Sequence, residues 1–134
     1  MKFALIICTY MRPKALLQLL QSVAEQTVAP TEIIIVDGSI NDQTKQALQQ
    51  NELKQLRYFM VSAQDRGLTR QRNYGIARVS QEMEVVCFLD DDIVLKKDYF
   101  DQLLKTYNEF PDALGVGGAI CNEDKFEFVG YDYQ

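Results

Sequence analysis

The stretch "VVCFLDDDIVL", residues 85–95, places five apolar residues directly before three adjacent aspartates, Asp90, Asp91 and Asp92. An unbroken apolar run of this length suits a strand that is buried on both faces, as in parallel sheets. Three adjacent carboxylates repel one another, and such packing is costly without a compensating cation. The stretch therefore predicts a buried parallel strand that ends at a charged site.

Apolar runs alternate with segments of helical period along the rest of the chain. The expected strands are 3–8, 33–36, 56–61, 85–89 and 114–120, with a short edge at 126–129. The expected helices begin at Pro13, follow Asp42 as N-cap to about Gln50, and cover 68–79 and 100–107. This alternation predicts an α/β fold: one domain over residues 1–134, with a doubly wound, mainly parallel sheet and helices on both faces.

Composition excludes several classes of function. The 134 residues carry a formal net charge of -5, which disfavours general nucleic-acid binding. The sequence contains no histidine, so imidazole catalysis is excluded. Its three cysteines are Cys8, Cys87 and Cys121, and two of them lie in apolar runs, which fits a reducing compartment. No apolar stretch approaches membrane-spanning length. We expect a cytoplasmic protein, with peripheral membrane contact left open.

Charged and polar residues follow the expected strands at the point where each strand ends. Carboxyl ends of parallel strands meet at one edge of the sheet, where ligands of such folds bind. The residues that converge there are Thr9, Tyr10, Arg12, Asp37, Gly38, Arg66, Gly67, Arg70, Arg72, Asp90, Asp91 and Asp92. Carboxylates and arginines together suit a ligand that has a hydroxyl-bearing part and a phosphate part.

The three adjacent aspartates indicate a metal site. An aspartate after a strand often caps a helix, but a cap requires one carboxylate rather than three. Oxygen ligands suit a hard divalent cation, Mg²⁺ or Mn²⁺. For Asp37, the cap and the ligand contact remain equally open. The segment "GLTRQRNYG", residues 67–75, contains no phosphate-loop pattern, so a Walker-type NTPase is not supported.

Four ordered segments of the chain resemble one protein family. They are "IICTYMRPKALLQLLQSVAEQT", "EIIIVDGSINDQT", "GLTRQRNYGI" and "FLDDDIVL". In that order and at these intervals they are similar to the nucleotide-sugar-binding half of family-2 glycosyltransferases, which are inverting enzymes with the GT-A fold. The last segment matches the Asp-x-Asp metal motif of that family. The resemblance implies binding of a UDP- or GDP-sugar and transfer of its sugar to a saccharide or lipid acceptor.

The resemblance also implies roles for individual residues. Thr9, Tyr10 and Arg12 would shape the pocket for base and ribose, and Asp37 would hydrogen-bond the nucleoside. Arg72 would hold the acidic loop or the base side of the pocket, with Arg70 among the substrate contacts. Asp90 would approach the ribose, Asp91 would contact substrate, and Asp92 with Asp90 would hold the metal against the diphosphate.

Two departures from the family pattern shape further expectations. Gly38 stands where the family often has a second acid that contacts the base. The family's general base lies beyond the metal motif, and Glu123 and Asp124 come too early to match it. We therefore expect a chain truncated before the acceptor-binding half, which binds donor without transferring sugar efficiently. Exposed edges would then favour a homo-oligomer.

Two alternative functions remain open. A receiver-type phosphoacceptor domain has a similar length and architecture, but it requires an acidic pair after the first strand, where this chain has Thr9 and Tyr10. A non-catalytic nucleotide-binding or regulatory module would use the same donor site without the chemistry of transfer.

Overall fold

The computed structural model describes residues 1–121, which form a four-stranded sheet in the order β3-β2-β1-β4. All strand pairs are parallel. The strands are β1 (Phe3–Thr9), β2 (Glu32–Asp37), β3 (Leu56–Met60) and β4 (Val85–Asp90). Four of the strands expected from the apolar runs are therefore confirmed, as is the parallel sheet.

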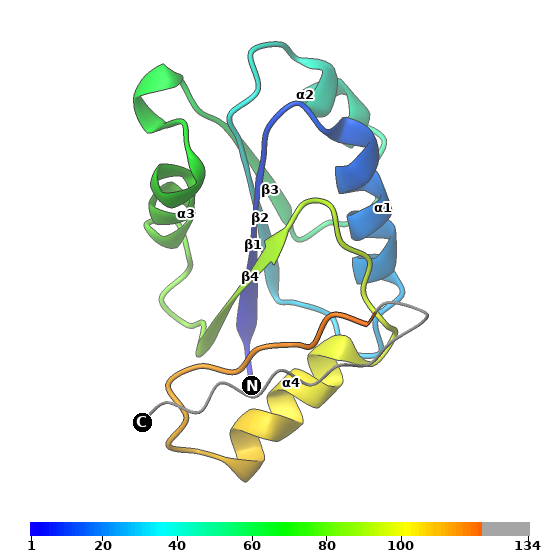
Figure 1. Ribbon diagram of the computed structural model, residues 1–134, viewed down its shortest axis with the longest axis vertical. Coiled ribbons are helices and arrows are strands. Elements are labelled where there is room, and N and C mark those ends of the chain that lie inside the picture. Colours follow the sequence, from blue (N-terminus) through cyan, green and yellow to red (C-terminus); the bar gives the residue numbers. More distant parts are fainter. Residues whose placement is uncertain (122–134) are drawn as a thin grey trace.

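Helices cover both faces of this sheet. They are α1 (Pro13–Ala24), α2 (Gln43–Leu48), α3 (Leu68–Ile76) and α4 (Tyr99–Glu109), with a 3₁₀ turn η1 (Ala63–Asp65) before α3. Figure 1 shows α1 and α2 on one side of the sheet and α3 on the other, while α4 lies near the amino-terminal end of β1. The doubly wound arrangement is confirmed, and Pro13 takes the first helical position, where its missing N–H costs nothing.

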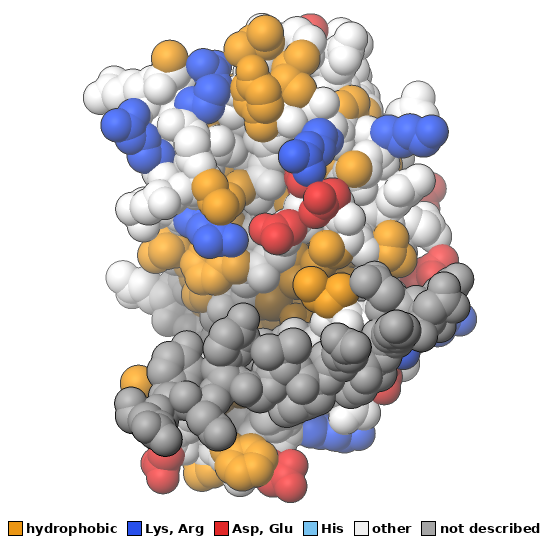
Figure 2. All heavy atoms as spheres, viewed as in Figure 1, with side chains coloured by type: hydrophobic (Ala, Val, Ile, Leu, Met, Phe, Trp, Pro, Cys, Tyr) orange, Lys and Arg blue, Asp and Glu red, His pale blue; other side chains and the backbone are white. Residues whose placement is uncertain are grey.

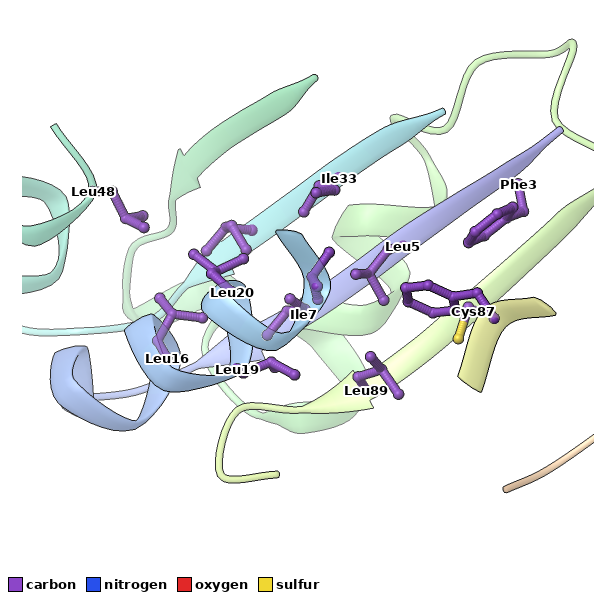
Figure 3. Packing of buried hydrophobic residues seen from close by; sticks show 13 residues of the cluster. Phe3, Leu5, Ile7, Leu16, Leu19, Leu20, Ile33, Leu48, Cys87 and Leu89 are labelled. Carbon is purple, nitrogen blue, oxygen red and sulfur yellow. The ribbon is translucent and has the colours of Figure 1, made fainter. Parts of the chain in front are cut away.

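The larger part of the core lies between the sheet and α1. Alternate residues of β1, Phe3, Leu5 and Ile7, point to this face and are almost fully buried. Figure 3 shows them against Leu16, Leu19 and Leu20 of α1. The three leucines recur at helical spacing, so one stripe of α1 faces the sheet.

The opposite face of the sheet is covered by α3. Ile6, Ile34 and Val36 are buried on this side. Gly75 of α3 lies against them so closely that an added Cβ would come within 2.8 Å of Ile6 Cγ2. A glycine at this position lets the helix approach the sheet, and that approach brings the start of α3 to the ends of β1 and β2.

One expectation about secondary structure is wrong, and a second holds only in part. Residues 114–120 form no strand, and the side chains of Leu114 and Ile120 are exposed. Asp42 takes the N-cap position of α2, but its carboxylate accepts from the Gln46 side chain rather than from a backbone amide. The expected edge at 126–129 lies outside the described residues, as do Glu123 and Asp124.

The order of the strands fixes where a ligand can bind. β1 lies between β2 and β4, and the chain leaves β1 on one side to build β2 and β3 before it returns to β4 on the other. The crevice at such a switch point, at the carboxyl ends of the strands, is the usual ligand site of doubly wound sheets. None of the helices in residues 1–121 is long and apolar enough to cross a membrane.

We expect Gly75→Ala to destabilise the protein by about 1–2 kcal/mol, because the new methyl group overpacks against Ile6. The better helix propensity of alanine, roughly 1 kcal/mol, offsets only part of this cost. Urea unfolding would measure the change. Gly115→Ala is the control, since no atom lies within 4 Å of its Cβ position. A stabilised Gly75→Ala variant would contradict the close approach of α3.

Candidate functional site

A cavity of about 570 Å³ opens at the carboxyl ends of β1 and β4. Its walls come from the end of β1, the turn after β4 and the start of α3. The lining residues are Cys8, Thr9, Tyr10, Arg12, Arg66, Gly67, Leu68, Gln71, Asp90, Asp91 and Asp92. The structure thus brings together six of the nine predicted site residues in one cavity at the switch point of the sheet.

The three aspartates differ in what they contact. Asp91 points into the protein, with 10% of its side chain exposed, and accepts a hydrogen bond of 2.8 Å from the Thr9 hydroxyl. The side chains of Asp90 and Asp92 are 65% and 55% exposed. The central carboxylate is therefore a structural link to β1, whereas the outer two are open to a ligand.

Two arginines partly neutralise these carboxylates. Arg12 Nη1 lies 3.4 Å from Asp91 Oδ1 and 3.2 Å from Asp92 Oδ2. Arg72 Nη2 lies 3.6 Å from Asp90 Oδ1. Arg72 also lies over the ring of Phe88, 5.6 Å from its centroid. Figure 2 shows acidic side chains gathered in the middle of this face with basic side chains close by. The pairs span the turn after β4 and restrict where its carboxylates can point.

Asp37 and Arg70 do not line the cavity. Asp37 is fully buried. One of its oxygens accepts from the Ser39 backbone N–H at 2.9 Å and the other from the Tyr58 hydroxyl at 2.6 Å. Burial and the hydrogen bond to Asp37 raise the pKa of Tyr58, so the phenol remains a donor. Arg70 donates to the carbonyl of Gln64. In this conformation both side chains serve the loops around the site, and their contact with substrate stays a prediction.

Gln71 is a site residue that the sequence analysis missed. Its buried amide donates to the carbonyls of Thr9 and Val36, at 3.1 and 3.0 Å, and accepts from the Gly67 N–H at 3.0 Å. It therefore ties the ends of β1 and β2 to the start of α3. Gln71 precedes Gly75 by four residues, which places both on the buried side of α3. The four-residue spacing from Gly75 could therefore have indicated that Gln71 is buried, whereas the sequence interpretation considered only the arginines of this segment.

Ser39 was missed as well. Its hydroxyl accepts from the Met11 N–H at 2.8 Å. Met11 has a φ of 55°, a left-handed conformation that non-glycine residues seldom adopt. The strained turn separates Tyr10 from Arg12 and aims both at the cavity, so the β2 loop helps to set the shape of the β1 loop.

The donor set of the cavity fits a hard divalent cation. No group of three or more Cys, Asp or Glu side chains in residues 1–121 is arranged to enclose a metal ion. A magnesium ion in a phosphate site usually takes only one or two carboxylates, with waters and substrate oxygens completing its shell. Asp90 and Asp92 supply such a pair. Burial raises the pKa of the Cys8 thiol to about 11, so it lines the cavity as a neutral group.

These features define a class of protein: a doubly wound α/β domain with a charged ligand site at its switch point. The profile of the Glycosyl transferase family 2 matches residues 4–132, and the chain belongs to that family. The family resemblance noted in the sequence is thereby confirmed.

Two named relatives are similar over most of this chain. Glucosyl-dolichyl phosphate glucuronosyltransferase of Haloferax volcanii is 30% identical over 90% of the chain. GalNAc(5)-diNAcBac-PP-undecaprenol beta-1,3-glucosyltransferase of Campylobacter jejuni is 30% identical over 81% of it. The chain spans 38% and 35% of the lengths of these two relatives.

Solved structures agree on the fold. The TarS structure of S. aureus, residues 1–349, has a TM-score of 0.68 at 26% identity, over 81% of this chain and 33% of that one. The mannosyltransferase PcManGT of Pyrobaculum calidifontis has a TM-score of 0.66 at 21% identity, over 79% of this chain and 32% of that one. The α/β architecture of the GT-A fold is confirmed for the described residues.

We expect Thr9→Val to destabilise the fold by about 1.5–3 kcal/mol, because the buried Asp91 carboxylate loses its hydroxyl donor. The substitution keeps the shape of the side chain, so packing changes little. Urea unfolding would measure the loss. Thr69→Val, at an exposed position of α3, is the matched control. Equal stabilities of the two variants would show that the Thr9–Asp91 contact contributes nothing.

The thiols provide a second test. The pKa values of Cys8 and Cys87 are raised to about 11 by burial, whereas Cys121 is exposed. At pH 8 roughly one in a thousand of the first two thiols is ionised, and only the thiolate reacts. Iodoacetamide should therefore label Cys121 alone in the native protein and all three in urea, as read by peptide mass spectrometry. Labelling of Cys8 at the rate of Cys121 would contradict the raised pKa of the Cys8 thiol.

Proposed function

We propose that this chain is the donor-binding part of a glycosyltransferase and that it binds a nucleoside-diphosphate sugar together with Mn²⁺ or Mg²⁺. The observation that carries the proposal is the different environment of the three adjacent aspartates. Asp91 is held inside by Thr9 and Arg12, while Asp90 and Asp92 open into the cavity. A site that needed only a helix cap would not hold two exposed carboxylates beside it.

In this proposal Asp92 and Asp90 hold the cation. When bound, the cation neutralises the diphosphate and so makes it a better leaving group. The protein's own contribution is to keep the two carboxylates in place. Arg72 pairs with Asp90, and Arg12 pairs with Asp92, and these pairs restrict the orientation of both carboxylates before the donor arrives. Thr9 and Tyr10, between the acidic turn and α3, border the space for ribose and base.

Similar proteins support the donor class. Among the similar structures, TarS was solved with UDP-GlcNAc and with UDP, and PcManGT with GDP-Man and Mn²⁺. The names of two relatives contain a lipid-linked saccharide, glucosyl-dolichyl phosphate in one and a diphosphate-linked undecaprenol in the other. We therefore propose a saccharide or lipid-linked saccharide as acceptor. Deprotonating its hydroxyl requires a carboxylate within hydrogen-bond reach, and the exposed acids of this cavity are committed to the cation.

Isothermal titration of the chain with UDP and with GDP, each with Mn²⁺ or with EDTA, tests the proposal. We expect binding only when Mn²⁺ is present. Asp92→Ala should weaken it at least about 100-fold, since even the outer partners of metal ligands account for 10–100-fold in affinity. The control is Asp112→Ala, which removes an exposed carboxylate beyond α4.

Two results would contradict the proposal. One is nucleotide binding that is equally tight in EDTA, which would show that Asp90 and Asp92 hold no cation needed for binding. The other is unchanged Mn²⁺-dependent binding in Asp92→Ala. Loss of binding in Asp112→Ala as well would show that the assay reports general electrostatics rather than the site.

A further inference from the structure

The two ends of the cavity differ in charge. The carboxylates that line it within residues 1–121 belong to the end of β4 and the turn after it. Arg66, between η1 and α3, lines the opposite end, where its Nε donates to the carbonyl of Gly38 after β2. Since β1 separates β2 from β4 (Figure 1), Gly38 after β2 and the aspartates at the end of β4 lie on opposite sides of β1. Two strand spacings in a sheet amount to about 9–10 Å. With the diphosphate at the acidic end, the base reaches the Arg66 end.

A side chain at position 38, directly after β2, does not fit beside this second end. A Cβ at Gly38 would come within 2.7 Å of Gln71 Oε1 and 3.1 Å of Arg66 Cγ. The Gln71 amide donates both of its N–H groups, to the carbonyls of Thr9 and Val36, and its oxygen accepts from the Gly67 N–H. The guanidinium of Arg66 also lines this end and can donate to a ligand.

This guanidinium offers donors and no acceptor. Among residues 1–121 its two terminal nitrogens make no hydrogen bond or ion pair that would occupy them, and Nε alone is engaged. A planar fork of donors pairs best with two adjacent acceptor atoms. Guanine presents O6 and N7 in this way, and arginine–guanine is the commonest specific contact of this kind. Unpaired cytosine presents O2 and N3.

The other common bases fit the fork poorly. Uracil places its N3–H donor between its two carbonyl oxygens, and adenine places an amino group beside N7. Either base would turn a donor toward the guanidinium, and a buried donor left without an acceptor is costly. Fixing the nucleotide by its diphosphate leaves the base little freedom to avoid this contact.

We infer that Arg66 is the residue that determines base specificity and that the site prefers a base with two adjacent acceptors, guanine first. This inference rests on the proposed binding of a nucleoside diphosphate. It assigns the choice of base to the segment between η1 and α3 rather than to the turn after β2.

Titration with GDP, CDP, UDP and ADP in the presence of Mn²⁺ tests the inference on the whole chain. We expect GDP or CDP to bind about 10-fold more tightly than UDP and ADP, within the range for a good bidentate pair. Arg66→Met should remove the difference between the affinity for the preferred nucleotide and the affinity for UDP. Arg57→Met makes the same chemical change on an arginine of β3 outside the cavity and should preserve the preference.

Arg66→Lys distinguishes the effect of the paired guanidinium donors from the effect of the positive charge. Lysine keeps the positive charge and loses the fork, so this variant should lose the preference while it still binds nucleotides. It also serves if Arg66→Met folds poorly, which thermal melting would reveal. A preference that survives in Arg66→Lys, or tightest binding of UDP or ADP by the wild type, would overturn the inference while the proposed function stands. Failure of all four nucleotides to bind would overturn the proposed function, and this inference with it.

Discussion

The hydrogen bond from Thr9 to Asp91 joins the ends of the two strands between which the cavity opens. A buried carboxylate requires partners, and here the partners are a hydroxyl from β1 and a guanidinium from the loop after it. Turning Asp91 inward leaves its neighbours Asp90 and Asp92 pointing outward. The exposed pair therefore depends on a contact that never touches the ligand.

In the loops around the cavity, too, residues without access to a ligand position those that have it. Asp37 holds Ser39, Ser39 holds the strained backbone at Met11, and Met11 separates Tyr10 from Arg12. Buried hydrogen bonds of this kind act as a network, in which each member fixes the next. The residues that face a ligand are thus positioned by residues with no access to it, and the strain at Met11 lies where functional sites commonly store it.

The sequence alone was enough for the sheet and for part of the site. Buried parallel strands leave unbroken apolar runs, and strand ends are where ligands bind, so Thr9, Arg12 and the three aspartates could be placed together. Which of these side chains are buried and which are exposed to a ligand could not be predicted. Whether Asp37 faces a ligand or a neighbouring loop depends on Tyr58, 21 residues away, and no local pattern records that contact. Residues 114–120 contain apolar side chains and glycines, yet nothing in that composition reports whether a neighbouring strand is available to pair with them.

The crowding of Gly38 by Gln71 has an evolutionary consequence. Any larger residue at position 38 meets the Gln71 amide, so it requires a second change in α3 before it can be accommodated. Shrinking Gln71 first removes its hydrogen bonds to the carbonyls of Thr9 and Val36. A substitution at position 38 or at position 71 is unfavourable by itself, and only the two substitutions together give a different packing of these side chains. The two positions are thus epistatic: a library that varies residue 38 alone samples mostly damaged proteins, whereas one that varies both can reach a different set of groups at this end of the cavity.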